Sequence, residues 1–252
     1  MSPSASLFFC LSARLMPLFV CATPIGNLGE VSPRLLDTLR AADLICAEDT
    51  RHTSNLLRHF EIATPLASCH AHTSPAKIAA LVERLTEGQT LALVTDAGTP
   101  GVSDPGPQLV REAVTAGITV SPIAGPCALI AALSVTGFDA QRFSFGGFLP
   151  RKPGKRRKAL NEYLAREEAL VFYEGPHRVV ALLTDLAERA PDRSVALCRE
   201  LTKKFEEVAR GTAQELATAW AKRKETRGEF VLVVGPGSAL VVDVDEDNSD
   251  GE

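Results

Sequence analysis

Residues 91–106 constrain the fold more than any other part of the chain. The segment begins with four apolar residues, 91–94, which predict a buried strand, and it continues directly into a loop with three glycines and two prolines. Such a loop carries little side-chain bulk and leaves backbone N–H and C=O groups accessible. In open α/β sheets, ligands bind at the carboxyl ends of the strands. The segment therefore predicts a strand of a parallel sheet with a ligand site at its end.

Two further apolar segments have the same arrangement. Residues 18–22 precede the loop 23–27, and residues 118–123 precede the loop 124–127. Because parallel strands end at one edge of a sheet, these loops predict a single small-molecule site. The chain lacks G-x-G-x-x-G and G-x-x-x-x-G-K-[ST], which argues against a dinucleotide-binding Rossmann domain and a P-loop NTPase.

The hydrophobic pattern predicts an α/β protein with two domains. Ser-Pro pairs at 32–33 and 74–75 predict helix starts, and helical and strand segments alternate up to about residue 136. This rhythm is typical of a parallel, helix-covered sheet. Beyond it, a predicted helix at 179–186 and short spacing between predicted strands indicate a hairpin and a mixed sheet. The strands expected there are 143–148, 169–173, 194–198, 205–210 and 230–234.

The expected domain organisation follows from this change of rhythm. Residues 17–128 form the N-terminal α/β domain and residues 129–238 the C-terminal one. Residues 1–16 are expected to be a disordered extension, and residues 239–252 an acidic disordered tail. The composition, 45% hydrophobic and 23% charged, is that of a soluble protein, and no apolar run is long enough for a membrane span.

Cysteine and histidine usage bears on compartment and on metals. The six cysteines contain no C-x-x-C pair, which favours a reducing cytoplasm over a disulfide framework. His70 and His72 have no third ligand at suitable spacing, so no metal site is expected.

Charge is concentrated in one basic segment and in the acidic tail. Six of the eight residues from 151 to 158 are basic, which indicates contact with phosphates as an alternative to an ordinary solvated helix start. They are Arg151, Lys152, Lys155, Arg156, Arg157 and Lys158. Polar clusters at 173–178 and 199–203 also follow apolar strands. They are either surface ion pairs or groups that face a cleft.

Taken together, the motifs resemble the tetrapyrrole methylase family. They are TPIGNL at 23–28, AEDTR at 47–51, TDAGTPGVSDPG at 95–106, GPCA at 125–128, FLPR at 148–151, FYEGPHR at 172–178, RELTKKFE at 199–206 and GEF at 228–230. The closest resemblance is to the branch that methylates the ribose 2′-oxygen of a decoding-centre cytidine in 16S ribosomal RNA. It runs from about residue 18 to residue 234.

The resemblance implies fold, cofactor and partners. It implies two α/β domains with S-adenosyl-L-methionine in the cleft between them, a cytoplasmic homodimeric enzyme without membrane attachment, and ribosomal RNA or the assembled 30S subunit as substrate. By motif, nine residues would bind the cofactor: Pro24, Gly26, Asp96, Gly98, Thr99, Val102, Ser103, Pro126 and Cys127. Family members often carry Ser where this chain has Cys127 and Gly175. These changes leave the shape of the site but put a hydrogen bond at 127 in doubt.

A ribose hydroxyl needs a proton acceptor, or a cation for the developing oxyanion. The candidates for these catalytic roles are Asp49, Glu174, Glu200 and Lys203, with Arg51 and Arg178 aligning RNA phosphates. Two alternatives remain open. One is a methylase of this fold acting on a tetrapyrrole or a protein side chain, and the other is a non-catalytic cofactor-binding module.

Overall fold

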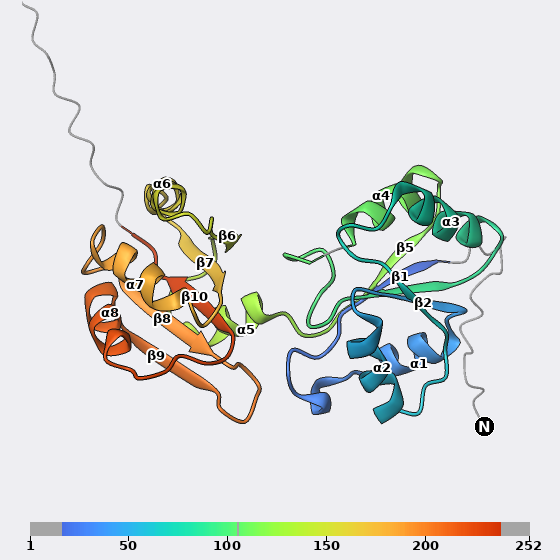
Figure 1. Ribbon diagram of the computed structural model, residues 1–252, viewed down its shortest axis with the longest axis horizontal. Helices are drawn as coiled ribbons and strands as arrows, with labels where there is room; N and C mark the ends of the chain where they lie inside the picture. The colour runs from blue at the N-terminus through green and yellow to red at the C-terminus, as the bar shows by residue number, and fades with distance from the viewer. Residues whose placement is uncertain (1–16, 105, 238–252) are drawn as a thin grey trace, which may run out of the picture. The chain divides into compact units, whose positions relative to one another are not determined.

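The computed structural model describes residues 17–104 and 106–237, which form two compact units divided between Cys127 and Ala128 (Figure 1). Each unit has its own sheet and its own hydrophobic core. The expected extension at 1–16 and the acidic tail at 239–252 lie outside the described residues.

The N-terminal unit is built on a five-stranded sheet in the order β3-β2-β4-β1-β5. Every pairing in it is parallel, as the sequence pattern predicts. The strands are β1 (Leu18–Cys21), β2 (Leu44–Ala47), β3 (Leu66–Ser68), β4 (Leu91–Val94) and β5 (Val120–Ile123).

Helices cover both faces of this sheet. Two of them begin at the predicted Ser-Pro pairs, where the Ser32 hydroxyl accepts a hydrogen bond from Leu35 N–H and the Ser74 hydroxyl accepts one from Lys77 N–H. In Figure 1, α3 and α4 lie on one side of the sheet, and α1 and α2 lie on the other. The helices are α1 (Pro33–Ala41), α2 (Thr50–His59), α3 (Pro75–Thr86) and α4 (Pro107–Thr115), with a 3-10 turn, η1, at Leu28–Glu30.

The C-terminal unit contains a mixed sheet in the order β6-β7-β10-β8-β9. β6 pairs parallel with β7, and the remaining pairings are antiparallel, including the expected hairpin β8-β9. The strands are β6 (Phe143–Phe148), β7 (Ala169–Glu174), β8 (Ser194–Arg199), β9 (Glu207–Thr212) and β10 (Phe230–Val234). The helices are α5 (Ala128–Thr136), α6 (Pro153–Leu164), α7 (Val179–Ala187) and α8 (Ala213–Ala221).

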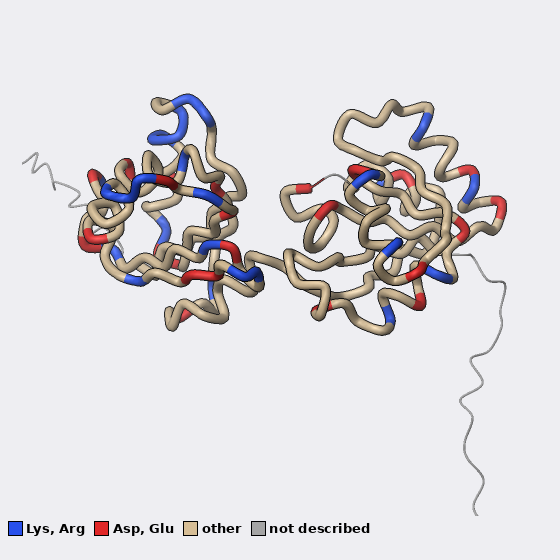
Figure 2. The backbone as a smooth tube through the Cα atoms, turned by 60° about the horizontal axis from the view of Figure 1, so that its bottom comes forward, with Lys and Arg blue, Asp and Glu red and all other residues tan. Residues whose placement is uncertain are grey.

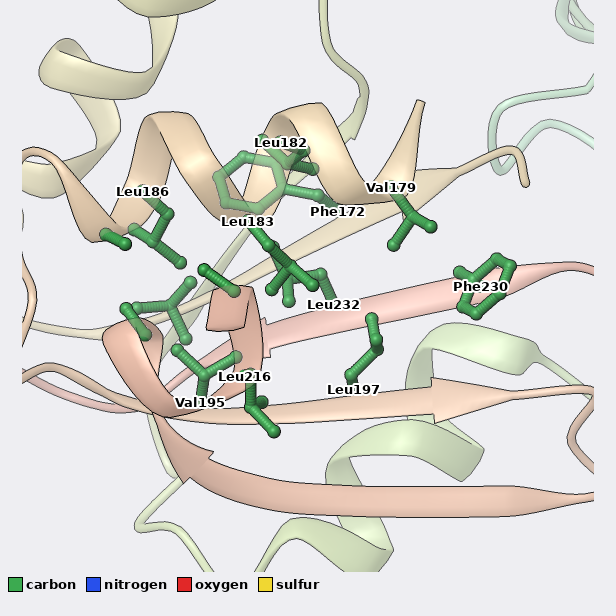
Figure 3. Close-up of a cluster of buried hydrophobic side chains, with 14 of the residues drawn as sticks. Phe172, Val179, Leu182, Leu183, Leu186, Val195, Leu197, Leu216, Phe230 and Leu232 are labelled. Carbon is green, nitrogen blue, oxygen red and sulfur yellow. The ribbon is translucent and has the colours of Figure 1, made fainter. Parts of the chain in front are cut away.

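Large side chains from helices and strands fill the core of this unit. Figure 3 shows Phe172 of β7, Leu182 of α7 and Leu232 of β10 among them. Trp220 of α8 is also buried and meets Phe230 edge-on at 5.4 Å between ring centroids. The rigid core fixes the strand ends that carry the polar residues considered below.

Over the described residues, no helix combines the length and the hydropathy that crossing a bilayer requires.

Candidate functional site

The three glycine-rich loops meet at one edge of the N-terminal sheet. They follow β1, β4 and β5, which are neighbours in the sheet with β1 in the middle. Thr23 N–H donates to the Gly98 carbonyl at 2.9 Å, and Gly98 N–H donates back to the Thr23 carbonyl at 3.1 Å. The Thr99 hydroxyl donates to the Pro126 carbonyl at 3.1 Å and so joins the third loop. The convergence expected from the sequence is therefore observed.

Glycine is required where these loops approach one another. Gly98 has φ +86°, and a Cβ there would lie 3.3 Å from Ile25 Cγ2. At Gly125, a Cβ would lie 3.1 Å from the Ala22 Cβ and 3.2 Å from the Ala22 carbonyl oxygen. Larger residues would force the loops apart. The loops therefore pack closely at these two positions because no side chain separates them.

The predicted cofactor residues all lie in these three loops. Pro24 and Gly26 are in the first loop, and Pro126 and Cys127 in the third, where Cys127 is a half-buried free thiol. The five in the second loop are Asp96, Gly98, Thr99, Val102 and Ser103. Val102 N–H donates to the Thr99 carbonyl at 3.3 Å, which closes a turn. Ser103 has φ +66°, unusual for a residue with a side chain.

Acidic residues from the end of β2 join the same edge. Asp49 N–H donates to Asp96 Oδ1 at 3.1 Å, and the Thr95 hydroxyl donates to Glu48 Oε2 at 2.7 Å. The Asp49 carboxylate itself caps α2 and pairs with Arg51, whose Nη2 lies 2.8 Å from Asp49 Oδ2. The hydrogen bonds from the Arg51 side chain and main chain hold the pKa of Asp49 well below its usual range. Asp49 is therefore a weak proton acceptor in this arrangement.

Asp104 is a candidate that motif reading did not single out. It lines a cavity of about 430 Å³ together with Glu48, His70 and Ser103. Partial burial, with Glu48 and then Asp96 nearby, raises the pKa of Asp104 to about 6. A carboxyl that titrates near neutral pH in a glycine-rich loop at a sheet edge is suited to proton transfer. The only sequence signal was an acid inside the longest glycine-rich loop.

In the C-terminal unit, Glu174 and Arg178 form a partly buried pair at the end of β7. Arg178 Nη2 lies 3.0 Å from Glu174 Oε2 and also donates to the Leu149 carbonyl at 2.6 Å. Glu174 Oε1 accepts from Gly175 N–H at 2.8 Å. Glu174 is only 2% exposed, and burial raises its pKa. The pair holds the ends of β6 and β7 together.

Glu200 and Lys203 form a second polar group, with Glu229 of the GEF motif as a partner that was not among the predicted site residues. Lys203 Nζ lies 3.1 Å from Glu200 Oε1 and 3.0 Å from Glu229 Oε2. Glu229 N–H also donates to Glu200 Oε1 at 2.9 Å. Burial acts to raise the pKa of Glu200, but these hydrogen bonds outweigh it and lower the pKa. Burial acts to lower the pKa of Lys203, but the carboxylates of Glu229 and Glu200 outweigh it, so the pKa is raised.

The conformation around Glu200 is tightly constrained. Glu200 has φ +49°, and Gly228 has φ +98°. A Cβ at Gly228 would lie 2.5 Å from Glu200 Cγ. A non-glycine residue in the left-handed region costs energy and is often found at functional sites.

The basic segment starts α6, but its residues do not share one environment. Arg151, Lys152, Lys155 and Lys158 are exposed, and Figure 2 shows this basic stretch at the top of the C-terminal unit. Arg157 is about half exposed, and its Nε lies 3.5 Å from Asp185 Oδ1. Arg156 was predicted with the others to contact phosphates, but it is buried with its Nε 2.6 Å from Asp185 Oδ2 and so is not available at the surface.

Metal ligands do not cluster in the part of the chain that the structure describes. No group of three or more His, Cys, Asp or Glu there could hold an ion. The His70 and His72 rings lie 6.3 Å apart, and His70 Nδ1 accepts from His72 N–H at 3.1 Å.

Solved structures of low sequence identity share the fold. Uroporphyrin-III-C-methyltransferase from Thermus thermophilus aligns with a TM-score of 0.60 at 21% identity, covering 87% of this chain and 94% of that one. Diphthine synthase aligns with a TM-score of 0.66 at 16% identity, covering 89% and 91%.

Sequence comparisons identify the family and relatives of higher identity. Residues 17–217 match the model of the Tetrapyrrole (Corrin/Porphyrin) Methylases. Ribosomal RNA small subunit methyltransferase I of Xylella fastidiosa (strain Temecula1) is 51% identical over 219 residues, 86% of this chain and 80% of that one. The protein of the same name from Escherichia coli O157:H7 is 46% identical over 233 residues, 91% and 81% of the two chains. The chain therefore belongs to the tetrapyrrole methylase family.

Proposed function

We propose that this chain is an S-adenosyl-L-methionine-dependent methyltransferase that modifies the RNA of the small ribosomal subunit. The observation that carries the proposal is the similarity, over most of both chains, to relatives named for that activity. The converged loops of the N-terminal unit support it, because they provide a site built of main chain at a sheet edge.

The residues of this edge fit a nucleoside cofactor. A Cβ at Gly98 would crowd Ile25, so the absence of a side chain there lets the first and second loops pair closely through their backbones. Pro24, Gly26, Asp96, Gly98, Thr99, Val102, Ser103, Pro126 and Cys127 would hold it. When bound, S-adenosyl-L-methionine supplies an electrophilic methyl group on sulfur.

The proposed acceptor is the ribose 2′-oxygen of a decoding-centre cytidine. A ribose hydroxyl is a poor nucleophile at neutral pH, so the protein must accept its proton or stabilise the oxyanion. Asp49 and Glu174 are each committed to an arginine. Glu200 and Lys203 are also paired with each other, and the left-handed backbone at Glu200 is the observation that favours this pair among the motif candidates. Asp104 joins the list because its pKa of about 6 suits a general base.

The exposed basic residues are the proposed contact for RNA phosphates. Arg151, Lys152, Lys155 and Lys158 offer accessible charge, and Arg51, although paired with Asp49, has a side chain that is 90% exposed. Two of them, Lys152 and Lys155, lie at the start of α6, where positive charge opposes the helix dipole. A phosphate would offset that unfavourable arrangement. Arg178 and Arg157 are partly engaged within the protein, and the buried Arg156 is left out of this surface.

This surface favours RNA over the alternative acceptors. A tetrapyrrole requires a deep apolar pocket, whereas four neighbouring exposed cations attract a polyanion. We further propose that the enzyme acts in the cytoplasm. We also propose that it is a homodimer, and light scattering of the purified protein tests this oligomeric state.

The decisive experiment supplies labelled S-adenosyl-L-methionine to small subunits from cells that lack the enzyme. Incorporation at one ribose, mapped by resistance to alkaline cleavage, is the expected result. Binding of the cofactor without transfer to RNA would support the non-catalytic module instead, and transfer to protein alone would also contradict the proposal.

The catalytic candidates are separated by single substitutions. Glu200→Gln and Lys203→Met are expected to reduce kcat by at least about 100-fold, within the range for a general acid or base. Cofactor affinity, measured by calorimetry, should remain within a few-fold of wild type. Full turnover in both variants would remove this pair from the mechanism and leave Asp104→Asn as the next test.

A further inference from the structure

A β-bulge near the end of β6 changes the direction of one aromatic side chain. The pairing of β6 with β7 shifts register between Phe145 and Gly147. The extra residue, Gly146, could not carry a side chain, because a Cβ there would lie 2.5 Å from the Phe172 ring. Gly147 has φ +56°, a conformation that glycine adopts most easily. A bulge of this kind re-aims the side chains that follow it.

The consequence is that Phe145 and Phe148 lie on the same side of the strand. Residues three apart in a regular strand point to opposite faces. Here both rings contact Tyr173, with centroid distances of 4.9 Å for Phe145 and 5.7 Å for Phe148. The Tyr173 hydroxyl accepts a hydrogen bond from Leu129 N–H at 3.0 Å, which fixes the ring that supports them.

Phe148 is exposed although its backbone is anchored. It is 59% exposed, whereas the next residue, Leu149, is 3% exposed. The Leu149 carbonyl accepts from Arg178 at 2.6 Å, and Arg178 is held in turn by Glu174. An aromatic ring kept in solvent by a rigid strand end costs hydrophobic free energy that a partner would recover.

Exposed cations follow this ring at once. Arg151 and Lys152 come three and four residues later, and Lys155 lies in the first turn of α6. An exposed aromatic ring beside a run of cations is the combination that binds single-stranded RNA, because bases stack on the ring and phosphates contact the cations.

We propose that Phe148 is a base-stacking residue for an unpaired nucleotide of the substrate RNA, whose phosphates contact Arg151 and Lys152. The inference rests on the proposed function and adds a positioning residue to it. Stacking would hold the strand so that a neighbouring ribose is presented out of its duplex or stacked context. A protein partner or a second copy of this chain is a less suitable occupant, because the exposed cations that follow the ring in the chain call for a polyanion.

The test compares Phe148→Ala with Phe143→Ala, a matched control at the other end of β6 that is 39% exposed. Binding to small subunits and to a single-stranded oligoribonucleotide is measured for both. Phe148→Ala should weaken binding by about 5- to 150-fold, the range for loss of one stacked base. It should raise KM more than it lowers kcat, and Phe143→Ala should match wild type.

A second measurement reports stacking directly. The only tryptophan, Trp220, is buried, so Phe148→Trp introduces the one exposed indole. RNA should quench its fluorescence and bind it with at least wild-type affinity, whereas the indole of Phe143→Trp should not respond. An unquenched Trp at 148 in a variant that still binds RNA would overturn the inference.

Other outcomes distinguish failure of the stacking role from failure of the proposed function. Equal binding by wild type and Phe148→Ala, with methyl transfer intact, would overturn the stacking role and leave the proposed function standing. Loss of cofactor affinity or of the oligomeric state in Phe148→Ala would assign the ring to another contact and also overturn it. Failure of wild type to methylate or bind small subunits would end both proposals.

Discussion

Arg156 and Asp185 form a buried ion pair in which Nε lies 2.6 Å from Oδ2, with side chains 8% and 7% exposed. The pair joins the basic α6 to α7 in the core of the C-terminal unit. Arg157, the next residue, lies 3.5 Å from the other oxygen of Asp185 but is 49% exposed. Adjacent arginines of one basic run therefore have different physical roles.

Removing Arg156 should destabilise the protein much more than removing Arg157. Arg156→Ala leaves the Asp185 charge buried with a weaker partner, which costs about 3–5 kcal/mol, whereas a half-exposed pair contributes less than about 1 kcal/mol. Urea unfolding followed by circular dichroism measures both variants. Equal and small losses would show that Asp185 is solvated. The double variant Arg156→Met, Asp185→Leu should recover most of the loss, because it removes both charges together.

The exposed cations should control the salt dependence of RNA binding. Each phosphate contact on a single strand contributes about 0.7 to the slope of log K against log salt. Replacing Arg151, Lys152 and Lys155 by Ala should therefore reduce the slope by about 2. Titrations at several salt concentrations measure it. Replacing Lys222 and Lys224, exposed cations elsewhere in the unit, is the control. A slope that falls equally in both variants would indicate general attraction rather than a defined surface.

Gly98→Ala should weaken cofactor binding, whereas a control variant with a similar loss of stability should not. Gly98 has φ +86° and has Ile25 and the Pro126 carbonyl within 4 Å of an added Cβ. Gly117 has φ +74° with nothing within 4 Å, so Gly117→Ala has a similar backbone cost without crowding. Each variant should lose about 1–2 kcal/mol of stability. Calorimetry should show at least about 10-fold weaker S-adenosyl-L-methionine binding for Gly98→Ala alone. Unchanged affinity would place the cofactor away from this loop.

Asp104 should make the protein less stable as the pH rises through about 6. Its pKa is raised in the folded state from an unfolded value of about 4, so folding favours the protonated form. The contribution of this group is fully present below pH 4 and is lost as the pH rises through about 6. Asp104 is partly exposed, so the difference amounts to about 1–2 kcal/mol. The free energy of unfolding of Asp104→Asn should therefore rise relative to that of wild type between pH 4 and pH 7, as measured by thermal or urea unfolding. A constant difference across this range would contradict the raised pKa.

Local sequence patterns predicted most of the fold. The apolar runs at β2 and β4 correspond to the observed strands residue for residue, because a buried strand is recognisable from a short apolar segment with turn residues after it. The parallel sheet and the β8-β9 hairpin also followed from element order and spacing. β3 was not predicted, since its three half-buried residues carry no distinct pattern. α8 was not predicted either, although Thr212 and Glu215 form a capping box at its start.

The sequence by itself determined which residue types stand at the strand ends, and so the class of site, because loop composition is a local property. The tertiary structure alone decided the environments of individual side chains. Arg156 is buried because Asp185, 29 residues away, meets it. The pKa of Asp104 is raised to about 6 because the folded chain partly buries this carboxyl and places Glu48 and Asp96 near it. Phe148 shares a face with Phe145 because of a bulge. Charge pairing, desolvation and register all depend on neighbours that are distant along the chain, and a local pattern carries no information about them.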